Sequence, residues 1–224
     1  MKREIIIIAI AVLLTGCADI SRYVPAPVGN ERAEIFMEYG AGGQALSGAL
    51  GPGSGTLGDQ IKAKFGSAVR ITGYYDWTDY SVIAVANAIP ASKKVIIIGD
   101  SCGASIGPFD AAAMTRPAEI IGVQASIYCP TVGFTDPVPS TTSFAEETYN
   151  PSLIETGGLG YRLYTAGPQT KLTIVQRPDL HPGLSQDFFD DALDEIGAIL
   201  ASSASLHGRT GGTRMLVRYH GQHF

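Results

Sequence analysis

A continuous run of β-branched residues in the middle of the chain is the feature that most constrains the fold. Residues 93–98 read Lys-Lys-Val-Ile-Ile-Ile, and such a run is typical of a central parallel strand buried on both faces. The next residues, 99–103, read Gly-Asp-Ser-Cys-Gly, and a helical pattern follows from Ala104 to about Met114. The sequence therefore predicts a buried strand that turns sharply into a helix, with Ser101 at the turn.

Further strands and helices alternate along the rest of the chain. Apolar runs predict strands, and apolar residues spaced by three or four predict helices. The expected strands are 35–39, 69–75, 120–127, a weak one near 147–149, and 171–175, and the expected helices are 57–65, 80–89 and 186–200. This alternation indicates the α/β class, with a single domain built on a mostly parallel sheet flanked by helices.

Composition excludes several kinds of partner and site. The chain has 224 residues, 45% of them hydrophobic, which suits one domain with a sizeable core. Its net charge is −5 and it has no long basic stripe, which argues against nucleic acid as a partner. Its three cysteines show no zinc-ligand spacing and are too few for a disulfide framework. We therefore expect no metal and no organic cofactor.

The N-terminus has the pattern of an export signal. Lys2 and Arg3 precede an apolar run over 5–14, which is shorter than the roughly 20 residues needed to span a bilayer. The run ends in Leu-Thr-Gly-Cys at 14–17, which resembles a bacterial lipobox. The resemblance implies loss of residues 1–16, lipid on Cys17 and anchorage in the bacterial envelope facing the periplasm. The alternative is an ordinary signal peptide with an incidental cysteine.

Composition shifts mark the remaining boundaries. Residues 17–33 contain prolines and little periodicity, so we expect a tether. The predicted domain covers 34–201, and 202–224 is expected to be a flexible tail. Alanine at position 18, in place of aspartate, slightly favours the outer membrane.

The turn at 99–103 has the form G-x-S-x-G. The sharp change of direction from strand to helix leaves room only for small residues at both ends of this motif. Side chains at 99 and 103 would collide with neighbouring backbone, and the strained turn lifts the serine hydroxyl above the sheet. The helix behind it directs backbone N–H groups toward a developing oxyanion.

With this turn in place, the chain resembles an α/β-hydrolase over most of residues 34–200. The order of strands and helices is that of the family, and Gly-Ala-Gly-Gly at 40–43 stands where the family has its oxyanion loop. The resemblance implies that Ser101 is the nucleophile and that the oxyanion donors are the N–H of Cys102 and that of Ala41 or Gly42. Cys102 itself is not expected to be a nucleophile, and Cys129 is expected to be a buried core residue.

The resemblance also implies a histidine base and an acid. His181 follows the last predicted strand, where the family places its base, whereas the other histidines lie in the tail. Asp136 is the chosen acid, on a loop after a predicted strand, and Asp179 is the main alternative. The other carboxyl groups in the allowed interval are Asp110, Glu119, Glu146, Glu147 and Glu155.

These residues predict a serine hydrolase that cleaves acyl esters through an acyl-enzyme, with little or no lid over its site. A cluster of aromatic residues either lines an acyl pocket or packs in the core; its members are Tyr74, Tyr75, Trp77 and Tyr80. Two alternatives remain. Gly-Asp-Ser also resembles the conserved block of SGNH hydrolases, although that family has it on its first strand. The second alternative is a non-catalytic envelope lipoprotein that has a hydrolase scaffold.

Overall fold

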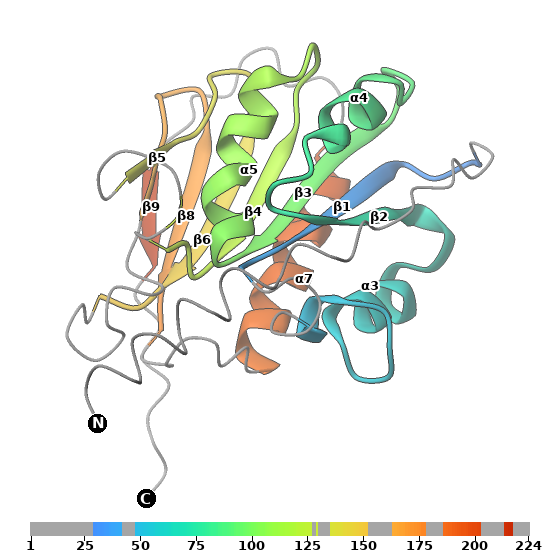
Figure 1. Cartoon of the computed structure of the whole chain (residues 1–224), viewed down its shortest axis with the longest axis horizontal. Coiled ribbons are helices and arrows are strands. Elements are labelled where there is room, and N and C mark those ends of the chain that lie inside the picture. The colour runs from blue at the N-terminus through green and yellow to red at the C-terminus, as the bar shows by residue number, and fades with distance from the viewer. Residues whose placement is uncertain are drawn as a thin grey trace, which may run out of the picture.

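The computed structural model describes residues 29–41, 48–126, 129, 135–151, 163–177, 186–202 and 213–216. They form a seven-stranded sheet with the order β2-β1-β3-β4-β6-β8-β9, and every pair of neighbouring strands is parallel (Figure 1). Its strands are β1 (Ala33–Tyr39), β2 (Val69–Asp76), β3 (Lys94–Asp100), β4 (Glu119–Val123), β6 (Phe144–Tyr149), β8 (Lys171–Gln176) and β9 (Thr213–Leu216). The predicted α/β class with a parallel sheet is confirmed.

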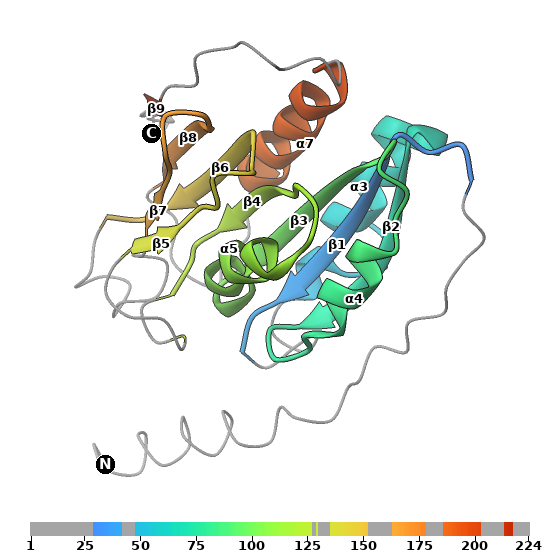
Figure 2. The same cartoon turned by 90° about the horizontal axis from the view of Figure 1, so that it is seen from above.

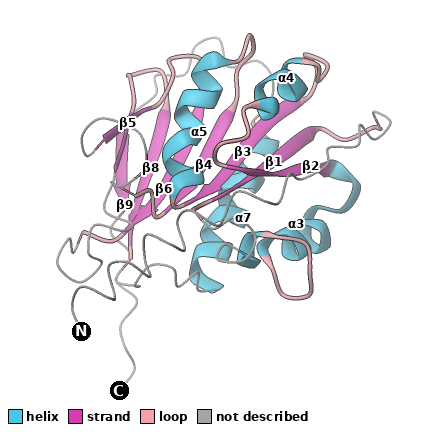
Figure 3. Ribbon diagram, viewed as in Figure 1, coloured by secondary structure: helices cyan, strands magenta, loops and turns pink. Residues whose placement is uncertain are grey.

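Helices cover both faces of this sheet, as Figures 2 and 3 show. The α-helices are α3 (Leu57–Phe65), α4 (Ser81–Asn87), α5 (Cys102–Ala113) and α7 (Gln186–Ala201), with short 3-10 turns at Gly48–Leu50 and Gly66–Ala68. Apolar residues of α3 and α7 pack on one face, and those of α4 and α5 pack on the other. Among the described residues, no helix has both the length and the apolar character required to cross a bilayer.

Strand β3 lies at the centre of both cores. Ile96 and Ile98 belong to the core under α3 and α7, while Val95 and Ile97 belong to the core under α4 and α5. All four side chains are at most 1% exposed. The β-branched run thus forms a strand buried on both faces, as predicted.

Three parts of the fold differ from the sequence prediction. Strand β6 extends back to Phe144, and two short segments, β5 (Thr135–Pro137) and β7 (Leu163–Thr165), pair as a second, parallel sheet. The expected flexible tail contains β9, which pairs with β8 at the sheet edge. Each of these strands is short, and its pairing partner is distant in sequence, so periodicity alone does not reveal it.

The strand order reverses direction at β1. The chain passes from β1 to β2 on one side and then crosses to β3 on the other side of β1. In open parallel sheets, ligands bind outside the carboxyl ends of the strands at such a reversal. The topology therefore predicts a ligand site at the segments that follow β1 and β3. These segments begin at Gly40 and Ser101.

Candidate functional site

Ser101 occupies a strained turn between β3 and α5. Its backbone has φ 57° and ψ −114°, and it directly precedes the first residue of α5, whose N–H groups receive no capping hydrogen bond from its side chain. A non-glycine residue at positive φ costs on the order of 1–3 kcal/mol, which the surrounding structure must offset. Such strain is common at functional residues and agrees with the sharp turn predicted from the sequence.

The glycines on either side of Ser101 permit this turn. A Cβ on Gly99 would lie 2.4 Å from the carbonyl carbon of Gly103, and one on Gly103 would lie 2.1 Å from the carbonyl oxygen of Glu38. Real Cβ atoms do not approach backbone atoms so closely. The predicted collision of side chains at 99 and 103 is therefore confirmed, and α5 begins directly against the end of β1.

The segment after β1 lies directly against the serine. A Cβ on Gly40 would be 2.7 Å from the Cβ of Ser101 and 3.2 Å from its Oγ. Ala41, one of the expected oxyanion donors, follows and is half-buried, whereas Gly42 lies outside the described residues. The turn at Ser101 and the start of the Gly-rich segment thus meet at the reversal point of the sheet.

Ser101 is less accessible than the sequence predicts. The residue is only 6% exposed, whereas a serine raised above the sheet in an open site would show more of its surface. The close approach of Gly40 accounts for part of this cover. Tyr75, one of the aromatic residues considered for an acyl pocket, is buried against Phe36 with ring centroids 5.9 Å apart, so it is a core residue.

A disulfide joins the residue after the serine to the segment after β4. Cys102 and Cys129 are bonded, with Cα atoms 5.2 Å apart, and both are buried. Nearby, the Ser105 hydroxyl donates to the carbonyl of Ser126 at 3.2 Å and accepts the N–H of the same residue at 3.1 Å. The first turns of α5 are therefore fastened to this segment at two points.

This disulfide is not among the features predicted from the sequence, where Cys129 is expected to be an ordinary core residue. The number of cysteines could have indicated the bridge. If Cys17 carries lipid, an exported chain retains two cysteines, and an even number in an oxidising compartment indicates a bridge.

Gln124, which follows the neighbouring strand, has a positive φ like that of Ser101. It follows β4, has φ 51° and is fully buried. The Ser101 N–H donates to the carbonyl of Val123 at 2.9 Å, and the Gln124 N–H donates to that of Thr148 at 2.8 Å. The carboxyl ends of β3, β4 and β6 are thereby tied side by side.

Asp136, the chosen acid, is fully buried in β5 beside Tyr164 and does not lie on an open loop as predicted. The Tyr164 hydroxyl donates to the carbonyl of Ala104 at 2.6 Å, close to the elbow. Burial raises the pKa of Tyr164 well above its usual value, and the nearby carboxyl groups of Glu147, Asp136 and Glu38 raise it further. Asp136 therefore belongs to a buried group of carboxyls on the α5 side of the sheet.

Of the other site predictions, His181, Asp179, Glu155 and Cys17 lie outside the described residues. Glu119 is at the start of β4, at the end of the strand opposite to the elbow, where it accepts the N–H groups of Ser143 and Phe144. That position removes Glu119 from the candidate acids.

The segment that contains His181 is bounded by a buried ion-pair network. Arg177 follows β8, is 2% exposed and contacts Asp191 of α7 at 2.5 Å and Asp187 at 3.3 Å. Its N–H donates to the carbonyl of Tyr149 at 2.9 Å. Arg177 thus joins the end of β8 to the first turns of α7 and to the end of β6.

Glu38 and Asp110 form a buried carboxyl pair beneath the elbow. Burial raises the pKa of Glu38 well above its usual value, and Asp110 raises it further. Burial also raises the pKa of Asp110 to about 6, partly offset by Glu38. Raised carboxyl pKa values mean that the fold favours the protonated forms, so the contribution of Asp110 to stability is complete below about pH 4 and is lost as pH rises through about 6.

Replacing Asp110 with Asn removes one of these ionisations. We expect the free energy of unfolding of Asp110→Asn, relative to that of the wild type, to be higher at pH 7.5 than at pH 4.5. Urea unfolding at the two pH values measures this difference. Asp194→Asn, a change at a 68%-exposed carboxyl, is the control and should show little change. A difference for Asp110→Asn that is equal at both pH values contradicts the assignment.

No family model, curated protein or solved structure matches this chain. Within the described part of the chain, no cluster of three or more His, Cys, Asp or Glu side chains could hold a metal ion.

Proposed function

We propose that this protein is a serine hydrolase that cleaves acyl esters. The observation that carries the proposal is the position of Ser101 at φ 57°, between a buried parallel strand and a helix, with Gly40 against it at the reversal point of the sheet. In support of the proposal, this arrangement is similar to that of a nucleophile elbow beside an oxyanion loop. The SGNH alternative is less favoured, since Ser101 follows the third strand of the chain and not the first.

In the proposed mechanism, His181 removes the proton of Ser101 as its Oγ attacks the acyl carbonyl carbon. The leaving alcohol takes that proton from His181, and water then releases the acyl group by the same route in reverse. The N–H of Cys102 and that of Ala41 or Gly42 stabilise the oxyanion, each with an effect of a few kcal/mol. Asp136 or Asp179 orients the imidazole.

The proposal extends to location. Cys17 carries the lipid and anchors the protein in the bacterial envelope. In support, Arg32 directly precedes β1, so the chain enters the domain at the amino ends of the strands, whereas Ser101 lies at the carboxyl ends. An anchored domain with this geometry can present its serine away from the membrane. Labelling of wild type, but not of Cys17→Ser, with a radioactive fatty acid tests the anchor.

Hydrolysis of p-nitrophenyl esters of increasing acyl length tests the activity. We expect turnover by the wild type, with the greatest kcat/KM for short acyl groups because Ser101 is only 6% exposed. His181→Ala is expected to abolish it, while Asp136→Asn and Asp179→Asn identify the acid by which of them lowers kcat. A wild type with no activity on any chain length supports the non-catalytic alternative.

Gly40→Ala tests the close approach of the segment after β1. The new Cβ would lie 2.7 Å from the Cβ of Ser101, so one of the two must move. Because a displacement of about 1 Å at a reacting group can cost about 100-fold in rate, we expect a loss of kcat of that order. Gly167→Ala, where the added Cβ meets nothing within 4 Å, is the matched control and should retain full activity. Full activity in Gly40→Ala would contradict the proposed site.

A further inference from the structure

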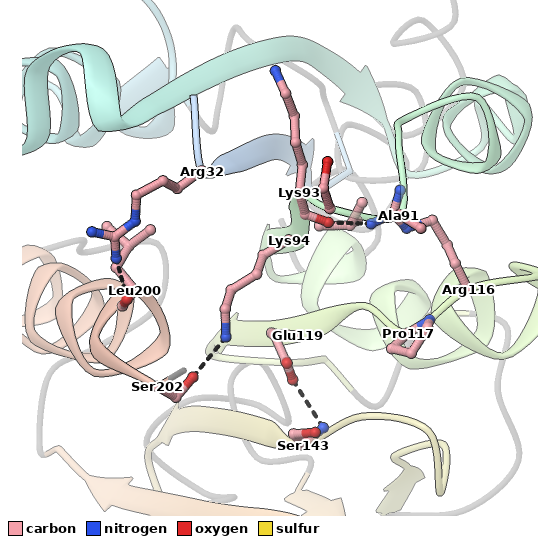
Figure 4. Close-up of a pocket in the computed structure, with 12 residues that line it drawn as sticks. Arg32, Ala91, Lys93, Lys94, Arg116, Pro117, Glu119, Ser143, Leu200 and Ser202 are labelled. Atoms are coloured by element: carbon pink, nitrogen blue, oxygen red, sulfur yellow. Dashed lines mark hydrogen bonds between the residues drawn. The ribbon is translucent and has the colours of Figure 1, made fainter. Parts of the chain in front are cut away.

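A pocket of about 450 Å³ lies at the opposite end of the sheet from Ser101 (Figure 4). Its wall comes from the starts of β3 and β4, the residue before β1 and the end of α7. The volume is within the range of small-molecule sites. The proposed hydrolase chemistry makes no use of this pocket.

The basic residues of this pocket differ from most others in the described chain. Most basic residues there lie within 4.0 Å of a carboxylate; these are Lys64, Arg70, Lys93, Lys171 and Arg177. Arg32, Lys94 and Arg116 have no such ion pair among the described residues, and all three line the pocket. Apart from the exposed Lys62 on α3, the described basic side chains without an ion pair therefore all lie at this pocket.

The contacts of these three cations are all with uncharged groups. Arg32 donates to the carbonyl of Leu200, and Lys94 donates to the Ser202 hydroxyl at 2.6 Å. Arg116 donates to the carbonyls of Ile89, Pro90 and Lys93. The bonds to Leu200 and to Ile89 satisfy carbonyl groups at or just after the ends of α7 and α4, and all of these bonds fix where the three side chains lie. They do not neutralise the charges.

Two further observations favour an anion as the ligand of this pocket. The Nε of Arg116 is buried with no hydrogen-bond acceptor among the described residues. Burial lowers the pKa of Lys94, and the positive charge of Arg32 lowers it further, although Glu119 opposes the change. A bound anion would offset the repulsion between Lys94 and Arg32 and would add negative charge beside the guanidinium of Arg116.

Glu119 is the acidic residue in the pocket wall. Its carboxylate accepts the N–H groups of Ser143 at 2.9 Å and Phe144 at 2.7 Å. Lys93, also in the wall, is paired with Glu31 and Glu34. Three unpaired cations against one carboxylate leave an excess of positive charge at the pocket, which suits the negative charge of a phosphate group.

We propose that this pocket binds a phosphate group, held by Arg32, Lys94 and Arg116. Guanidinium groups suit phosphate because their planar N–H donors match its oxygens in pairs. The phosphate belongs either to a small soluble ester or to the headgroup of a phospholipid. Arg32 stands where the chain enters the domain, which places the pocket on the side that an N-terminal anchor would hold near a membrane.

The test uses the full chain with Cys17→Ser, so that no lipid anchor carries the protein to vesicles. Binding of sn-glycerol 3-phosphate is measured by calorimetry, and binding to phosphatidylglycerol vesicles is measured by flotation against phosphatidylcholine vesicles. Lys94→Gln should weaken binding about tenfold, as expected for loss of a charge-assisted hydrogen bond. Glu119→Gln should strengthen it, because its amide oxygen can still accept the two N–H groups while a repelling charge is lost.

Lys62→Gln is the matched control, since Lys62 is an exposed lysine of α3 outside the pocket. It should leave binding unchanged, and ester hydrolysis should be unchanged in all three variants. Binding of the soluble ester alone identifies a small phosphate ester as ligand, and Lys94-dependent flotation alone identifies a phospholipid headgroup. Absence of both kinds of binding overturns the proposal, as does equal weakening by Lys62→Gln and Lys94→Gln. Neither result bears on whether Ser101 is a nucleophile.

Discussion

Ser101→Ala is expected to lower the kcat for ester hydrolysis on the order of 10⁴- to 10⁶-fold, because it removes the atom that attacks the acyl carbonyl. The side chain of Ser101 provides no helix cap to α5, and alanine is smaller than serine. We therefore expect the free energy of unfolding to change by less than about 1 kcal/mol. Steady-state kinetics and urea unfolding on the same preparation separate the two effects.

The control for this variant is Ser67→Ala, a change at an exposed serine of the 3-10 turn Gly66–Ala68. It should retain full activity. If Ser101→Ala kept its turnover while it remained folded, the reaction would be carried by another residue, and the assignment of the elbow as the catalytic site would be wrong.

Loss of the disulfide is the second large effect that we expect. The bridge closes a loop with a sequence separation of 27, and the chain-entropy relation assigns about 3 to 4 kcal/mol to a loop of that length. For a domain of this size that corresponds to a fall in Tm of about 10 °C. The double variant Cys102→Ser, Cys129→Ser, measured by calorimetry, tests the value.

The bridge also has an expected role in turnover. Cys102 supplies a proposed oxyanion N–H, and its side chain is attached to the segment after β4. We expect Cys129→Ser to lower kcat more than it raises KM, because a displaced N–H group weakens binding of the oxyanion more than binding of the ground state. Cys102 should remain less important than Ser101, since serine at position 102 preserves the backbone donor. Unchanged kcat at a temperature well below the lowered Tm would limit the bridge to a structural role.

The centre of the fold was predictable because its signals are local. The run from Val95 to Ile98 indicated a doubly buried strand, and the glycines at 99 and 103 indicated a sharp turn into a helix. Each of these is a property of adjacent residues. The structure confirms the strand and the turn, and the backbone of Ser101 has the expected strained conformation.

The peripheral strands were harder to predict because their stability comes from distant partners. Strand β6 reads Phe-Ala-Glu-Glu-Thr-Tyr, and all of these residues are buried although two are glutamates. The sequence suggested a loop for much of this region. Strand β9 follows a polar segment and is recognisable only by its pairing with β8.

The candidate site was predictable in part for the same reason. Ser101 and the Gly-rich segment after β1 are marked by local motifs, and the structure brings Gly40 against Ser101. The catalytic acid has no local sequence signal, because any carboxylate on a loop at the carboxyl edge of the sheet could orient the histidine. Asp136 was chosen as a loop residue, whereas it is buried in β5 beside Tyr164.

Labelling with a fluorophosphonate probe, followed by peptide mapping, tests the central claim most directly. Such probes phosphonylate a serine only where a base activates it and an oxyanion site holds the adduct. We predict one adduct per chain, on the peptide that contains Ser101, with labelling abolished in Ser101→Ala and in His181→Ala. An unlabelled wild type, or an adduct on any other residue, would contradict the account.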